Sequence, residues 1–236
     1  MSILSVFKCI NDSFLLVILN MSKSVKSTKV KGGDKRLEQI GDDIWKNRTT
    51  KINNELFTMT YGSIVGQICR EENYNYNKVN EILFNMGYNI GNRLIEEFLS
   101  ISLIERCNNF KETAEVISKI GFRMFLNISP IISNWSIDEQ TFQLTFEENP
   151  LAEFVELPDE YDEEEENNSS SNIKGNARGE LWYSNILCGV LKGCLEMVQL
   201  ECEVWFVSDV LRGDDNTSIK VRLINILRDE IPVGDD

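Results

Sequence analysis

The fold is decided by residues 181–226, which read LWYSNILCGVLKGCLEMVQLECEVWFVSDVLRGDDNTSIKVRLINI. The first part, to about residue 201, is apolar at helical spacing and carries Gly189 and Gly193 four residues apart. This pattern predicts a long and almost wholly buried helix. Apolar and polar residues then alternate at 203–211 and 218–226, on either side of the turn sequence GDDN. The stretch therefore predicts one helix followed by a β-hairpin.

Two further helices are predicted upstream, each from apolar residues at three- and four-residue spacing. The first begins at candidate N-caps in residues 53–54 and ends near Arg70. The second runs from about residue 78 to residue 99 and contains Gly87 and Gly91. A glycine inside a helix costs about 1 kcal/mol relative to alanine. This pair therefore predicts close backbone packing against a neighbouring element.

A third upstream helix is predicted to begin near Asn109, which forms a capping-box-like pair with Glu112, and to continue to Phe125. After Pro130 the spacing of apolar residues changes from helical to alternating. Residues 142–146 and 151–157 are therefore predicted to be strands. The order of elements favours an α+β fold, in which four long helices cover one face of a four-stranded, mainly antiparallel sheet.

The domain organisation follows from composition. Residues 52–236 are expected to form one domain, interrupted by an acidic, disordered insertion at 159–179. Residues 1–51 hold ten basic and five acidic residues, and from residue 22 they are rich in Ser, Thr and Lys, which predicts a disordered basic arm. The apolar run 14–19 is too short to span a bilayer. We expect residues 1–20 to be an upstream extension, with translation starting at Met21.

The composition excludes several classes of chemistry. The chain has no His, so Ser-His-Asp and Cys-His catalysis and His-containing zinc sites cannot be built. No two of its six cysteines have the C-x-x-C spacing of zinc or redox motifs, and no metal is expected. The net charge of −14 argues against nucleic-acid binding, because residues 52–236 carry 14 basic and 33 acidic residues.

Six stretches in order resemble the subunit 3 family of the TRAPP (transport protein particle) vesicle-tethering complex. They are ELFTMTYG (55–62), NMGYNIGNRLIEEFL (85–99), RCNNFKETAEVISKIGF (106–122), ENPLAEFVELPD (148–159), CGVLKGCLEMVQ (188–199) and DVLRGDD (209–215). The resemblance implies a non-catalytic core subunit that binds other small TRAPP subunits as a heterodimer or homodimer through helical surfaces. The assembled complex tethers vesicles in endoplasmic-reticulum-to-Golgi transport and supports nucleotide exchange on a Rab-type GTPase. The implied location is cytoplasmic, peripheral on cis-Golgi and endoplasmic reticulum membranes.

The resemblance also implies a fatty acyl group, palmitoyl, on Cys107, threaded into a hydrophobic tunnel past Gly121. The residues agree in part, because adjacent Arg106 and the helix N-terminus at Asn109 are both expected to lower the pKa of the Cys107 thiol. The alternatives are that Cys107 is only a small residue in a tight loop, that Arg106 is only a solvated surface side chain and that Gly121 is only a helix packing contact.

In the family, the acidic C-terminus reaches toward the GTPase. Here that tail carries Asp229, Glu230, Asp235 and Asp236. Its carboxylates would compete with bound phosphates. The alternative is a frayed polar terminus.

Two other functions remain open from the sequence. One is an acyl-transfer enzyme that uses Cys107 as its nucleophile, although the chain has no His to act as a base. The other is a lipid-handling protein that carries lipid without belonging to any complex.

Overall fold

A four-stranded antiparallel sheet organises the molecule, in a computed structural model that describes residues 34–158 and 176–227. The strand order is β1-β2-β4-β3, and every neighbouring pair is antiparallel. The strands are β1 (Ile131–Ser133), β2 (Thr141–Phe146), β3 (Leu200–Ser208) and β4 (Thr217–Ile226). Phe142, Leu144 and Phe146 of β2 are buried, and half-buried residues alternate with them, so one face of the sheet packs on the core. The predicted α+β class and antiparallel sheet are confirmed.

One predicted strand is wrong. Residues 151–157 contain turns, in which the Leu151 amide donates to Asn149 Oδ1 and the Val155 amide donates to the Ala152 carbonyl. The fourth strand is instead β1, which comes directly after Pro130 and pairs with β2. A three-residue strand is too short to show an alternating pattern, and the apolar residues at 151–157 are accounted for by the buried side chains of Leu151 and Leu157.

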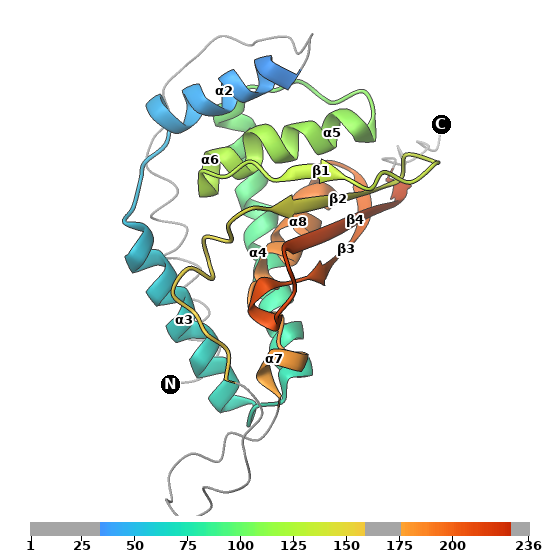
Figure 1. Cartoon of the computed structure of the whole chain (residues 1–236). Helices are drawn as coiled ribbons and strands as arrows, with labels where there is room; N and C mark the ends of the chain where they lie inside the picture. Colours follow the sequence, from blue (N-terminus) through green and yellow to red (C-terminus); the bar gives the residue numbers. More distant parts are fainter. Residues whose placement is uncertain (1–33, 159–175, 228–236) are drawn as a thin grey trace, which may run out of the picture.

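Several of the helices cover the buried face of the sheet, and others lie farther from it, as Figure 1 shows. The N-caps Asn53, Asn75 and Asn109 each accept a hydrogen bond from a backbone amide in the first turn. The caps at 53 and 109 confirm the predicted helix starts. The helices are α3 (Asn54–Glu71), α4 (Tyr76–Ser102), α5 (Phe110–Val116), a π-helix (Ile117–Gly121), α6 (Phe122–Leu126), α7 (Ala177–Glu180) and α8 (Ile186–Met197), with a 3-10 turn at Val210–Arg212.

Helices α4 and α8 touch backbone to backbone. A Cβ atom added to Gly87 would lie 2.0 Å from the Ile186 carbonyl oxygen, and one added to Gly91 would lie 2.3 Å from the Val190 oxygen. From the other side, a Cβ on Gly189 would lie 2.0 Å from the Phe84 oxygen. These distances leave no room for a side chain, so the close packing predicted for the glycine pair in α4 is confirmed.

The predicted disordered arm is wrong for residues 34–47, which form helix α2 (Asp34–Asn47). Leu37 and Ile44 are buried on one face of α2, and this tertiary contact stabilises a short segment that is rich in charged residues. Residues 177–179 of the predicted insertion likewise belong to α7. The Arg212 guanidinium lies 3.8 Å from the centroid of the Trp182 ring and donates to backbone carbonyls of α7, which fixes this short helix.

The remaining expectations about terminal and inserted segments fall on residues 1–33, 159–175 and 228–236, which lie outside the described residues. These are the translation start at Met21, the first part of the basic arm, most of the acidic insertion and the whole acidic tail. They stay predictions.

The glycine contact between α4 and α8 gives a test of what holds the helical layer together. We expect Gly189→Ala to lower the free energy of unfolding by roughly 1–3 kcal/mol, because the methyl group must push the Phe84 carbonyl away. Gly66→Ala in α3 is the matched control, since its Cβ would meet only the Arg70 side chain at 3.8 Å. Denaturant unfolding measures both, and equal effects would contradict the packing argument.

Candidate functional site

Cys107 lies in the connection between α4 and α5, and both ends of this connection are fixed by the local sequence. Helix α4 ends where Leu103 adopts a left-handed conformation with φ 54°. Helix α5 begins after Asn109, whose Oδ1 accepts from the Glu112 amide at 2.8 Å. The Glu112 side chain reaches back and accepts from the Asn108 amide at 2.7 Å. The predicted capping pair is therefore present, and it holds the half-buried Cys107 thiol in place.

Cys107 and Gly121 both line one large, mostly apolar pocket, which is partly open to solvent and has a volume of about 2110 Å³. Ligand pockets for small molecules are typically on the order of 300–1,000 Å³, so this cavity is large enough for a long hydrocarbon chain. Its walls include residues of the C-terminal half of α4 and of α8, among them Ile95, Phe98 and Leu191.

Gly121 is half-buried and differs from the buried glycines of α4 and α8. A Cβ added to it would meet only the Val116 carbonyl oxygen, at 3.9 Å, which is an ordinary van der Waals distance. The position therefore borders open space and does not pack tightly against a second backbone. Gly121 also ends the π-helix, and such local irregularities of a helix occur frequently at functional sites. The geometry disfavours the alternative that Gly121 is only a packing contact.

The expected lowering of the Cys107 pKa is wrong. Burial raises the pKa of the Cys107 thiol, the charge of Glu112 raises it further, and a hydrogen bond with Thr113 acts in the opposite direction. Arg106 is exposed at the surface, where water and salt weaken its influence. The thiol is therefore protonated near neutral pH, and the site favours an uncharged sulfur.

Sequence reasoning missed several residues that line the same cavity. Burial raises the pKa of Glu97 on α4 to about 7, so this carboxyl group titrates near neutral pH. The Cys194 thiol on α8 donates to the Gly91 carbonyl at 3.3 Å. Trp45 and Arg48, at the C-terminal end of α2, also line the cavity. The sequence contained a signal that Glu97 is partly buried: it lies three residues after Leu94, on the apolar stripe of its helix.

Residues 34–158 and 176–227 lack two kinds of feature. No helix within these ranges is both long enough and apolar enough to cross a membrane. No three His, Cys, Asp or Glu side chains within them are grouped as ligands for a metal ion.

The comparisons with known proteins agree in family and fold. A family model described as transport protein particle (TRAPP) component matches residues 57–222. The trafficking protein particle complex subunit BET3 of Saccharomyces cerevisiae is 57% identical over 200 residues, covering 85% of this chain and 95% of the relative. Trafficking protein particle complex subunit 3 of Dictyostelium discoideum is 46% identical over 202 residues, covering 86% of this chain and 99% of the relative.

Among solved structures, the crystal structure of trafficking protein particle complex subunit 3 from Naegleria fowleri, covalently bound to palmitic acid, is similar to this chain. It has a TM-score of 0.65 and 42% sequence identity, and the match covers 76% of this chain and 100% of the other. Together with the antiparallel sheet and its helical layer, these matches show that the chain belongs to the subunit 3 family of the transport protein particle.

Proposed function

We propose that this chain is a core subunit of a TRAPP complex and carries a fatty acyl chain, as a thioester on Cys107, inside its own cavity. One observation carries the proposal: Cys107 and Gly121 line the same large apolar cavity. The palmitic acid bound covalently to the similar protein from Naegleria fowleri supports this choice of ligand. Burying a methylene group contributes about 0.8 kcal/mol. A palmitoyl chain would therefore stabilise the fold in the manner of additional core.

The acylation step is a thioester exchange. The Cys107 thiolate attacks the carbonyl carbon of a fatty acyl thioester, the new carbon–sulfur bond forms, and the donor thiolate leaves and takes up a proton from water. Burial raises the pKa of Cys107 and so opposes the charged nucleophile. The thioester product carries no charge and meets no such penalty. The site thus favours holding an acyl group over repeated transfer.

The complex-level function rests on family membership. We infer that the chain assembles with other small TRAPP subunits and that the complex acts in endoplasmic-reticulum-to-Golgi transport. In that setting it supports nucleotide exchange on a Rab-type GTPase, bound peripherally at cis-Golgi and endoplasmic reticulum membranes. The acidic tail, Asp229, Glu230, Asp235 and Asp236, is proposed to approach the GTPase. This chain supplies binding surfaces and no bond-making step in exchange.

A candidate partner surface lies on α3. Leu56 and Met59 are 65% and 67% exposed, and they lie near the half-exposed Ile52 at the start of the same region. Large apolar side chains that cluster on the surface of a soluble domain are typical of protein interfaces. We propose this α3 surface as one contact with another TRAPP subunit.

The first prediction compares acylation among variants. Wild-type protein should show an acyl mass increment that Cys107→Ala loses because the nucleophile is gone. Gly121→Leu should lose it too, because a Cβ at this position borders open space and Gly121 lines the cavity, so the larger side chain would fill part of it. Gly121→Ala is the matched control and should keep the acyl group, since one methyl group still fits. Intact-mass spectrometry reads the adduct and circular dichroism reads the fold. An unmodified wild type, or an acylated Gly121→Leu variant, would contradict the proposal.

Incubation with an excess of acyl-thioester donor separates the proposed role from its alternatives. One stable adduct per chain is the expected result. Multiple turnovers would indicate an acyl-transfer enzyme, and lipid that solvent extracts without breaking a thioester would indicate a carrier.

The pH dependence of acylation follows from the raised pKa of Cys107. Only the thiolate reacts, so the initial rate should rise with pH and reach half of its maximum above pH ~8.5, which is the midpoint expected for an ordinary cysteine. Glu112→Gln should move the profile to lower pH, because Glu112 raises the pKa of this thiol. Rates of adduct formation across a pH series measure both. A wild-type profile with its midpoint at or below pH ~8.5 would contradict the burial argument.

The α3 surface gives a prediction for assembly. The double variant Leu56→Glu, Met59→Glu should co-purify with TRAPP subunits in smaller amount than wild type, because charge is placed in an apolar contact. Ile137→Glu is the control, since Ile137 is fully exposed at a distant turn. Quantitative mass spectrometry after affinity purification from native extract is the measurement. Equal recovery of partners with both variants would place the interface elsewhere.

A further inference from the structure

Helix α2 lies against the far side of the α5–α6 segment from the sheet, as Figure 1 shows. The two elements cross closely, because a Cβ added to Gly41 would lie 2.2 Å from the Lys119 carbonyl oxygen in the π-helix. The inner face of α2 is buried at Leu37, Gly41 and Ile44. Helix α2 thus rests on the same π-helix that Gly121 ends, and that residue lines the cavity.

The α5–α6 segment has two apolar faces with different neighbours. Phe110 and Phe122 point toward the sheet, and their rings contact those of Phe142 and Phe146. The opposite face belongs to a second hydrophobic cluster, distinct from the main core and without any strand residue. The buried members of the second cluster are Leu37, Ile44, Ile95, Phe98, Val116, Ile120 and Met124.

Cys107 packs against the second cluster, as does Cys194. Removal of α2 would take Leu37 and Ile44 away and expose the rest of the cluster to water, while the main core between α8 and the sheet stays closed. Helix α2 therefore covers the cluster against which Cys107 packs, and it contributes no residue to the main core.

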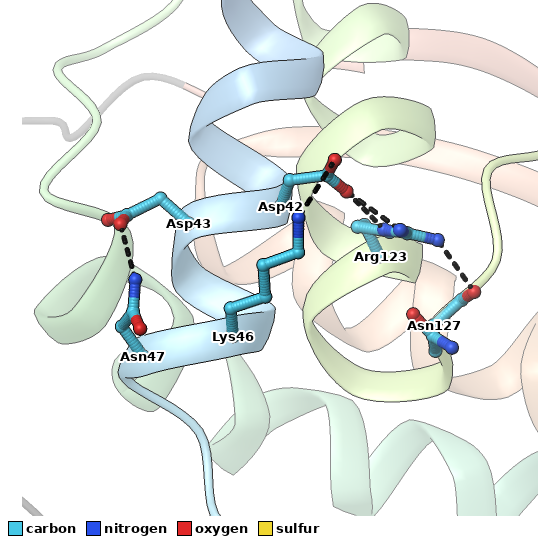
Figure 2. A network of polar contacts seen from close by, with 6 residues as sticks. All are labelled: Asp42, Asp43, Lys46, Asn47, Arg123 and Asn127. Atoms are coloured by element: carbon cyan, nitrogen blue, oxygen red, sulfur yellow. Dashed lines mark hydrogen bonds and ion pairs between the residues drawn. The ribbon is translucent and has the colours of Figure 1, made fainter.

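Ion pairs and hydrogen bonds join the edge of α2 to the π-helix and α6, and Figure 2 shows those around Asp42 and Arg123. The Arg123 guanidinium bonds Asp42 Oδ1 through Nε at 2.8 Å and Nη2 at 2.7 Å, and its Nη1 donates to the Asn127 carbonyl at 3.0 Å. Lys119 pairs with Glu38 at 2.5 Å. The carboxylates of Glu38 and Asp42 are 49% and 44% exposed, so both pairs are reached by solvent and are weak individually.

The C-terminal end of α2 is joined to the end of α4 by Arg48. Arg48 pairs with Asp43 at 3.1 Å and donates to the Ile101 carbonyl, at the end of α4, at 3.4 Å. Residues 48–52 then run along the cavity wall to α3, with Thr50, Lys51 and Ile52 exposed. This short non-helical connection gives α2 a point about which to move as one body.

We propose that α2 is a movable cover of the acyl cavity: it undocks to let a long-chain acyl thioester reach Cys107, and an acyl chain in the cavity holds it docked. The nature of the ligand rests on the function proposed above, whereas the covering of Cys107 does not. The coupling follows from linkage, since a ligand that contacts α2 only in the docked state shifts the equilibrium toward that state.

The test uses Gly41→Leu in the full chain, because the added side chain must displace α2 from the Lys119 backbone. Gln39→Leu is the matched control, since Gln39 lies on the exposed face of the same helix. Both proteins are first deacylated with hydroxylamine and then exposed to N-ethylmaleimide, and peptide mass spectrometry follows each cysteine. Cys107 in Gly41→Leu should react roughly tenfold faster, equivalent to about 1.4 kcal/mol lost from docking. Cys188 and Cys202 of the main core should stay protected.

An unchanged Cys107 rate in Gly41→Leu, with Cys188 protected, would overturn the proposal. If Cys188 reacts as well, Gly41→Leu has lost its fold. The proposal is then tested with charge variants, which disturb the packing of α2 less. Asp42→Arg should speed labelling of Cys107, and adding Arg123→Asp should restore the wild-type rate by rebuilding the ion pair with reversed charges. Equal rates of Cys107 labelling in the wild type, Asp42→Arg and the double variant would also overturn the proposal.

Hydrogen exchange of the α2 amides tests the coupling to the acyl chain. Residues 37–46 should exchange more slowly in the acylated wild type than in the same protein after hydroxylamine treatment. Equal exchange would overturn the coupling. A wild type that carries no acyl group would instead remove the proposed function, and the labelling of Cys107 would still decide whether α2 is its cover.

Discussion

The helical layer depends on the backbone contact between α4 and α8. Gly87 and Gly91 on one helix and Gly189 and Gly193 on the other bring carbonyl groups within 2.0–2.4 Å of the positions where side chains would begin. Such a contact fixes the two helices in both distance and register, because any larger residue would force them apart. Helix α8 then carries the pair onto β3, where its apolar face meets the buried side of the sheet.

The cavity forms where this close contact gives way to larger side chains. Beyond Gly91, helix α4 presents Ile95 and Phe98, and α8 presents Cys194 and Leu195 toward the same space. The mostly apolar lining of this pocket suits the proposed occupant, because a hydrocarbon chain needs no polar partners.

The electrostatics of the site suit storage of an acyl group. Partial burial and the charge of Glu112 raise the pKa of the Cys107 thiol, so the thiolate is a minor species near neutral pH. A slow nucleophile is compatible with a modification made once per molecule. A cover that restricts access to the sulfur would make the same modification long-lived.

The sequence by itself determined the elements whose pattern is local. Caps at Asn53 and Asn109, alternation through β2 and the helical glycines each depend on a few neighbouring residues, so they could be predicted with the fold class. Tertiary structure alone decided β1, whose three residues form a strand only because β2 lies beside them. It decided α2 in the same way, through burial of Leu37 and Ile44 against distant helices. It also reversed the expected pKa shift at Cys107, because burial is set by every segment packed around a group and adjacent residues such as Arg106 cannot reveal it.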